Sequence, residues 1–155
     1  MPSTAEQLLE LGFEPRHLLV VAVDVPCRAG REVLHAKWKT SGPKIGSGGL
    51  YAFTVDGRVM YLGMTTALEM VTHGVRGAQA RGPQRYGGLA NDKDCRPTQT
   101  RLRINSLINE QLRSSREVLH WLLPIAGASE AELKRRESEL IRRWGLDQTG
   151  WNRRG

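Results

Sequence analysis

The distribution of apolar and polar residues along the chain predicts a mixture of strands and helices. Leu18 to Val25 is almost continuously apolar and is followed by Pro26, which is typical of a buried strand that ends at the proline. Polar and apolar residues alternate from Glu32 to Thr40, which predicts a second strand. Ahead of both, leucines between Thr4 and Phe13 predict a short helix, and Ser41 to Gly49 has the glycine content of a loop.

Two strand-like runs flank the dipeptide Asp56-Gly57, and this arrangement predicts a β-hairpin. The first run extends from Leu50 to Val55 and the second from Arg58 to Leu62. Each run contains one tyrosine, and taken by themselves such tyrosines are more often ordinary strand aromatics.

The length of the hairpin turn decides where the two tyrosines point, because side chains alternate between the faces of a strand. A two-residue turn would place Tyr51 and Tyr61 on opposite faces. A three-residue turn, Asp56-Gly57-Arg58, would pair Phe53 with Tyr61 and bring both tyrosines to one face. If the tyrosines share a site, the sequence therefore predicts the longer turn.

The second half of the chain reads as helix, loop, helix, strand and helix. Apolar residues at helical spacing predict helices over residues 66–75 and from about residue 98 or 100 to Arg113, with a loop over residues 80–98. The run from Glu117 to Pro124 is apolar on both faces, which predicts a strand in the centre of a sheet. A capping box over residues 129–132 predicts a last helix that runs to about Trp144.

These elements predict an α/β (α+β) fold in which a small mixed β-sheet is flanked by helices. A chain of 155 residues suits one globular unit with a substantial core. Within this unit we distinguish residues 1–48, an N-terminal extension that adds a helix and edge strands, from residues 49–155, the main domain.

Glu137 is the candidate functional residue of the last helix. It lies four residues after Leu133 and four before Ile141, in the middle of the apolar stripe that should pack inward. Glu132 and Glu139 do not share this placement. An ionised carboxylate at such a position needs a cation, hydrogen-bond donors or a metal ion. Taken by itself, the position is more often that of a glutamate that is paired with an arginine or lies at the margin of the core.

The charge of the chain points to a polyanionic partner. Twenty-three lysines and arginines against 16 acidic residues give a net charge of +7 and a pI of about 10.0. The cations gather in two stretches, an arrangement suited to lining the two sides of a groove for nucleic-acid phosphates. The stretches comprise Arg76, Arg81, Arg85, Lys93, Arg96, Arg101 and Arg103, and Lys134, Arg135, Arg136, Arg142, Arg143, Arg153 and Arg154.

Other classes of function are disfavoured. The glycine-rich segment at residues 41–49 lacks the Gly-Lys-Ser/Thr ending of a phosphate-binding loop. Cys27 and Cys95 are isolated, which indicates reduced thiols rather than a disulfide or a metal site. No apolar run approaches the ~18 residues of a membrane span, and the N-terminus has no signal-peptide pattern. We therefore expect a cytoplasmic protein.

The two tyrosine motifs, Gly49-Leu50-Tyr51 and Tyr61-Leu62-Gly63, resemble those of the GIY-YIG nuclease family, in particular its stand-alone bacterial or phage-type members. Family members continue with a threonine and a leucine that open a helix. A glutamate with an aliphatic residue four positions later and an aromatic-asparagine pair follow downstream. The resemblance covers about residues 49–152, and its further matches here are Thr65, Leu68, Glu137, Ile141, Trp151 and Asn152.

One family feature is displaced. The helix that follows the second motif usually carries an arginine about three residues after its leucine, and that position here is Val71. Arg76 is the nearest candidate, with Arg81 and Arg85 as later alternatives. The departure leaves the arginine of the site open and raises the alternative of a protein that keeps the fold without cleaving.

The resemblance implies an endonuclease that hydrolyses phosphodiester bonds in DNA with Mg²⁺, or Mn²⁺, held by Glu137. Tyr61, with Tyr51 beside it, would position or deprotonate the attacking water, and Asn152 would orient the site. Arg76 by preference would bind the scissile phosphate, and His73 is a further candidate proton carrier. Nucleic-acid binding is expected from Arg81, Arg85, Arg101 and Arg103. The alternative is a catalytically weak or inactive nucleic-acid-binding protein, and the oligomeric state is open.

Overall fold

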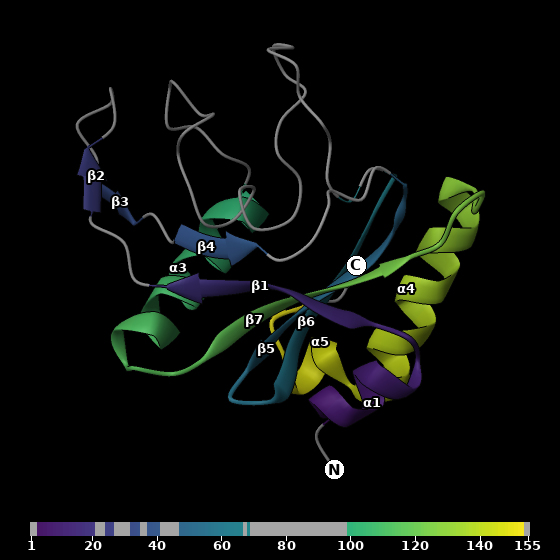
Figure 1. Ribbon diagram of the computed structural model, residues 1–155, viewed down its shortest axis with the longest axis horizontal. Helices are drawn as coiled ribbons and strands as arrows, with labels where there is room; N and C mark the ends of the chain where they lie inside the picture. Colours follow the sequence, from purple (N-terminus) through teal and green to yellow (C-terminus); the bar gives the residue numbers. More distant parts are fainter. Residues whose placement is uncertain are drawn as a thin grey trace.

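The computed structural model describes residues 3–20, 24–26, 32–34, 37–40, 47–66, 68 and 99–153. The predicted helix over residues 66–75 and the predicted loop over residues 80–98 lie almost wholly outside this part of the chain. The elements, labelled as in Figure 1, are α1 (Ala5–Glu10), β1 (Glu14–Val20), β2 (Asp24–Pro26), β3 (Glu32–Leu34), β4 (Lys37–Thr40), β5 (Gly49–Val55), β6 (Arg58–Thr65), α3 (Gln99–Arg113), β7 (Val118–Pro124), α4 (Glu130–Trp144) and α5 (Leu146–Thr149).

Five strands form the central sheet in the order β4-β1-β7-β5-β6. The central position predicted for β7 is confirmed. The α+β class is confirmed as well, but every neighbouring pair in this sheet is antiparallel, so the sheet is not mixed. Strands β2 and β3 pair separately. Two predicted strands have wrong bounds: the first begins at Glu14, ahead of its apolar run, and the second is divided into β3 and β4.

Helices cover both faces of the sheet, which gives a three-layer arrangement with two cores (Figure 1). The first core contains Tyr51, Phe53 and Tyr61 from the hairpin, together with Ile104 and Ile108 of α3. The second core lies beneath α1, α4 and α5 and has Leu50, Ala52 and Leu62 on the sheet side. Alternation along β5 therefore sends its tyrosine towards α3 and its leucine towards α4.

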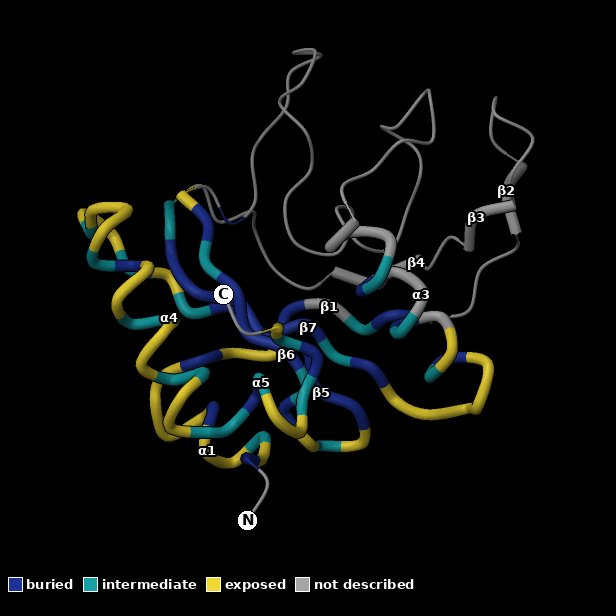
Figure 2. Tube along the Cα trace, turned by 180° about the vertical axis from the view of Figure 1, so that it is seen from behind, coloured by how far each residue is buried: buried dark blue, intermediate teal, exposed yellow. Residues whose placement is uncertain are grey.

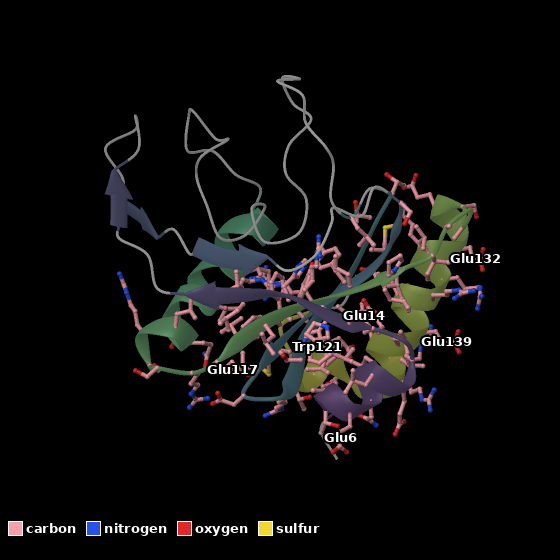
Figure 3. The ribbon with its side chains drawn as sticks, in the orientation of Figure 1. Glu6, Glu14, Glu117, Trp121, Glu132 and Glu139 are labelled. Carbon is pink, nitrogen blue, oxygen red and sulfur yellow. The ribbon has the colours of Figure 1, made fainter. Side chains whose placement is uncertain are left out.

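The burial pattern follows this layering (Figure 2). Strand β5 is buried along its whole length, whereas the outer surfaces of α1 and α4 are exposed. Trp121 of β7 lies near the middle of the sheet (Figure 3) and donates a 2.8 Å hydrogen bond from Nε1 to Thr54 Oγ1. None of the helices in the described part of the chain is long and apolar enough to cross a membrane.

The segment predicted as an N-terminal extension contributes to the same sheet. β4 forms one edge, as expected, but β1 is interior because it pairs with both β4 and β7. α1 adds Leu8 to the second core. The boundary at residue 48 stays a prediction.

The hairpin turn has two residues, so the predicted three-residue turn is wrong. Val55 pairs with Arg58, and Asp56 and Gly57 have positive φ angles of 47° and 81°. This is the backbone conformation of the tightest hairpin turns. Asp56 tolerates it because both its backbone and its side chain are held by Glu117, the residue before β7. Its N–H donates to the Glu117 carbonyl at 2.8 Å, and its carboxylate accepts from the Glu117 N–H at 2.9 Å.

A β-bulge restores the pairing that the longer turn was expected to produce. The register shifts between Phe53 and Thr54, so that Thr54 pairs with Val59 while Phe53 pairs with Tyr61. Met60 is the extra residue, and its carbonyl accepts a 2.5 Å hydrogen bond from the Trp151 N–H. Both tyrosines thus reach one face, as predicted, by a different local route.

Helix α4 is capped as predicted, by Ser129. The Ser129 hydroxyl accepts a 3.1 Å hydrogen bond from the Glu132 N–H. The second half of the predicted capping box is replaced by an ion pair, because the Glu132 carboxylate accepts from Arg136 at 3.0 Å. The helix ends at Gly145, which has a left-handed φ of 61°.

Candidate active site

Tyr51 and Tyr61 lie beside each other on the hairpin. Their ring centroids are 6.1 Å apart, and both pack around Phe53, at 6.3 Å and 6.2 Å. Both tyrosines are nearly buried, with exposed fractions of 3% and 8%. The two rings therefore lie on one face of the hairpin, as the sequence predicted.

The glycines of the two motifs make room for this packing. Gly63 is paired with Tyr51, and a Cβ at Gly63 would lie 2.3 Å from the Tyr51 ring and 2.5 Å from its hydroxyl. A Cβ at Gly49 would lie 2.1 Å from the Leu123 carbonyl of β7. The second motif therefore ends in glycine because the Tyr51 phenol lies directly over that position.

Gly63→Ala is expected to destabilise the fold by about 1–3 kcal/mol, because the added methyl displaces the Tyr51 ring from a packed core. Urea denaturation measures this cost. The same substitution in a Tyr51→Val background is the control, since the clash is then removed. Equal costs in the two backgrounds would contradict a direct contact between the methyl and the phenol.

Asn152 holds the C-terminal segment against the edge strand β6. Its Nδ2 donates to the Leu62 carbonyl at 2.8 Å, and its Oδ1 accepts from the Leu62 N–H at 3.0 Å. The side-chain amide therefore satisfies the backbone of Leu62 as a neighbouring strand would. Leu62 lies between Tyr61 and Gly63, so Asn152 fixes the backbone of the second motif.

Asn152→Ala is expected to cost about 1–3 kcal/mol of unfolding free energy, because two partly buried backbone groups lose their partner. Asn152→Asp keeps the acceptor for the Leu62 N–H but loses the donor and places a carboxylate against the Leu62 carbonyl. Because these oxygens repel each other, the aspartate variant should lose at least as much unfolding free energy as the alanine variant. Thermal unfolding of both variants measures the order. A neutral alanine variant would show that the hydrogen bonds contribute nothing to stability.

Glu137 differs from the other glutamates of α4. Glu130, Glu132 and Glu139 each form an ion pair with a cation four residues away in the helix, at 3.2 Å, 3.0 Å and 3.3 Å. Positions four residues either side of Glu137 are apolar, and in the described part of the chain no hydrogen bond or ion pair reaches its carboxylate. Figure 3 shows Glu132 and Glu139 on the outer side of the helix.

The environment of Glu137 disfavours its ionised form. The side chain is partly buried, and this burial raises the pKa of Glu137, while the positive charge of Lys134 lowers it to a smaller extent. Structural ion pairs usually have the opposite effect on a carboxylate. The arginine-paired arrangement considered from the sequence is therefore not found among the described residues.

Glu137 and the tyrosines approach β6 from different layers. Leu140, Ile141 and Trp144 of α4 pack into the second core, whereas Tyr61 belongs to the first. The contacts of α4 with the sheet are nevertheless mainly with β6, the strand that carries Tyr61 and forms the edge. The two layers meet along this edge, where Asn152 is also bound.

The predicted arginines divide into two groups. Arg76, Arg81 and Arg85, together with His73 and Val71, lie outside the described residues. Arg101 belongs to α3, and Arg103 of the same helix is half-buried, with its Nε shielded from solvent. Arg103 is thus more enclosed than the surface arginine that the sequence predicted for nucleic-acid binding.

His120 is a residue of the tyrosine cluster that the sequence did not single out. It is fully buried on β7, paired with Phe53, and its ring centroid lies 4.8 Å from Phe53 and 5.5 Å from Tyr51. Alternation with Val118 and Leu122 predicts its inward direction. The residues that pack against His120 depend on the order of the strands in the sheet. The alternation of residues along one strand does not predict that order.

The donor set fits a hard divalent cation held mostly by water. In the described part of the chain there is no group of three or more histidine, cysteine, aspartate or glutamate side chains close enough to enclose a metal. Glu137 offers one carboxylate without a competing partner, and Mg²⁺ commonly uses one or two protein carboxylates and retains several waters. Glu137 is therefore compatible with Mg²⁺ or Mn²⁺, and the described residues provide no closed structural site.

Comparison with known proteins gives a structural relative. No family model matches the chain, and neither does any curated protein. Among solved structures, the chain is similar to a mutant of bacteriophage T4 EndoII, with a TM-score of 0.58 and 17% sequence identity. The match covers 92% of this chain and 95% of that chain. The name of the relative marks it as an endonuclease, so the chain has an endonuclease-like α+β fold.

Proposed function

We propose that this chain is a metal-dependent endonuclease that hydrolyses phosphodiester bonds in DNA and uses a GIY-YIG type of site. The observation that carries the proposal is Glu137, which is partly buried and, among the described residues, has no ion-pair partner on a helix whose other glutamates are all paired. The likeness to EndoII supports a nuclease-like function and DNA as the substrate class. The excess of cations supports a polyanionic substrate.

The proposed chemistry assigns one task to each group. Glu137 would hold Mg²⁺ or Mn²⁺, which when bound supplies positive charge to stabilise the pentavalent transition state and the leaving oxygen. Tyr61, ionised to the phenolate, would orient the attacking water and take its proton, with Tyr51 fixing the position of the ring. An unperturbed tyrosine has a pKa near ~10, so this step needs a neighbouring cation. Arg76, Arg81 or Arg85 is proposed for that role and for binding the scissile phosphate.

A second candidate function is DNA binding without cleavage. It is favoured by the burial of Tyr51 and Tyr61, which are 3% and 8% exposed and pack as members of a hydrophobic core. Val71 at the usual arginine position favours it as well. In this case the hairpin would be a structural remnant and the basic surface would bind nucleic acid.

A plasmid assay separates the two candidates. Supercoiled plasmid incubated with the protein and Mg²⁺ or Mn²⁺ is expected to give nicked and then linear DNA, and EDTA should stop the reaction. Glu130→Gln is the matched control, because it removes an exposed glutamate of the same helix and should cleave normally. Binding in a gel shift without nicking, across several metals and DNA structures, would establish the second candidate.

A further inference from the structure

An apolar patch with exposed leucines lies on the layer opposite to the tyrosines. Leu9 and Leu11 are the large apolar side chains classed as exposed in the described part of the chain, with exposed fractions of 55% and 41%. Both belong to α1 or the turn that follows it. Scattered exposed leucines need no explanation, but two in one short segment, one of them on the wall of a cavity, indicate a surface that a partner can cover.

Leu11 also lines a cavity of about 270 Å³ between the turn that follows α1 and helix α4. Its floor is formed by Leu11, Leu50, Leu123 and Leu140. Its rim is basic, with Arg135, Arg136 and Arg143 and one acidic residue, Glu139. The cavity is open to solvent and large enough to receive one or two apolar side chains.

The charges around this patch are divided between its two helices. Arg135 and Arg136 are paired within α4, whereas Arg143 has no ion-pair partner among the described residues. On α1, Glu6 and Glu10 are exposed and likewise have no ion-pair partner in the described ranges. Figure 3 shows Glu6 directed away from the molecule.

Glu10 is also poorly placed for the stability of its own helix. It is the last residue of α1, and the last turn of α1 contains no basic residue. A carboxylate at a helix C-terminus is disfavoured by the helix dipole, so a cation from elsewhere is needed to offset it. The arginines of the cavity rim belong to α4, and Figures 1 and 2 show α4 beside α1.

We propose that this patch binds a second copy of the chain in a two-fold symmetric dimer. The acidic, leucine-bearing α1 of each protomer would dock on the leucine floor and arginine rim of the other. Acidic and basic halves that adjoin on one surface are self-complementary under a two-fold axis, so the contact closes at two chains. DNA is a poorer occupant, because a sugar-phosphate backbone does not fill a floor of leucines and two of the three rim arginines are already paired.

The dimer is independent of the proposed nuclease activity and is tested on DNA-free protein. Light scattering and sedimentation velocity at rising concentration should give a mass approaching twice the 17.3 kDa of one chain. A small interface of this kind predicts a dissociation constant that is roughly micromolar. A mass of one chain throughout, up to millimolar protein, would overturn the proposal.

Charge reversal provides the decisive experiment. Glu10→Arg alone and Arg143→Glu alone should each raise the dissociation constant at least about tenfold, because each places like charges together twice in the dimer. An equimolar mixture of the two variants should associate nearly as well as wild type, since both contacts are then between opposite charges. Arg142→Glu, on the same helix but outside the cavity, is the matched control and should dimerise normally.

A substitution at Leu9 tests the apolar part of the proposed interface. Leu9→Ser should weaken the dimer without unfolding the chain, because Leu9 is more than half exposed. Circular dichroism of each variant establishes that it is folded. A mixture that stays monomeric, or single variants that dimerise like wild type, would overturn the proposed interface even if the wild type forms a dimer by another surface.

Discussion

Glu137→Gln is expected to lower metal-dependent DNA cleavage by about 10³-fold or more, while making the folded protein more stable at neutral pH. Cleavage should fall because the neutral amide binds a divalent cation far more weakly than the carboxylate. Stability should rise because an ionised, partly buried carboxylate without a partner among the described residues is replaced by a neutral group of the same shape. A loss of function combined with a gain in stability distinguishes a functional carboxylate from a structural one.

The stability gain should depend on pH in one direction. Burial raises the pKa of Glu137 in the folded state above the ordinary glutamate value of 4.5, so the folded state binds this proton more tightly than the unfolded state. The contribution of Glu137 to stability is therefore fully present below 4.5 and is lost as the pH rises through the raised folded value. Denaturation curves from about pH 4 to about pH 8 should show the two proteins converging in acid and differing most at neutral pH.

Stabilisation of the fold by Mg²⁺ is a second, independent test of the role of Glu137. Mg²⁺ that binds only the folded state should stabilise the wild type by about 1.4 kcal/mol at ten times its dissociation constant. Glu137→Gln should lose this effect, and Glu130→Gln should keep it. Stabilisation by Mg²⁺ that survives in Glu137→Gln would place the ion elsewhere.

Tyr61→Phe is expected to reduce cleavage by about 10²- to 10⁴-fold with little change in stability. The substitution removes one hydroxyl and keeps the ring that packs against Phe53 and Tyr51, so the core is preserved and the unfolding free energy should change by about 1 kcal/mol or less. Steady-state nicking rates measure the effect on activity, and gel shifts should show unchanged DNA binding.

The tyrosine pair also offers its own controls. If the two phenols act together, Tyr51→Phe combined with Tyr61→Phe should cost little more than the worse single variant, because groups that act as a unit are not additive. Phe53→Leu should have the opposite effects to Tyr61→Phe. It should lower the unfolding free energy, because Phe53 is fully buried, but the protein that remains folded should still cleave DNA. Full activity in Tyr61→Phe would make the tyrosine pair structural and favour binding without cleavage.

The hairpin shows how far local pattern predicts structure here. Alternation and the Asp56-Gly57 dipeptide correctly predict a hairpin in which Phe53 opposes Tyr61. The predicted turn was wrong because the extra residue lies at Met60, where the Trp151 N–H binds the bulge from the far end of the chain. Because this hydrogen-bond partner lies 91 residues away, the sequence of the strand alone does not predict the bulge.

Helical spacing also predicted that Glu137 points inward, but it could not predict on which side of the sheet its helix lies. Helical spacing places it between Leu133 and Ile141, and the structure confirms that its side chain is partly buried. The face of the sheet that α4 covers depends on the topology of the five strands. The spacing of apolar residues carries no information about that topology. The sequence therefore predicted one pocket, whereas the structure has Glu137 and the tyrosines in two layers that meet at β6.

The most direct test of the account is a crystal of the protein with a short DNA duplex and Mn²⁺, examined by anomalous diffraction. We predict an anomalous peak at the Glu137 carboxylate, with a DNA phosphate oxygen beside the ion and the Tyr61 hydroxyl facing the same phosphate from across the β6 edge. Manganese bound away from Glu137, or a duplex whose phosphates lie on a face that excludes either residue, would contradict it.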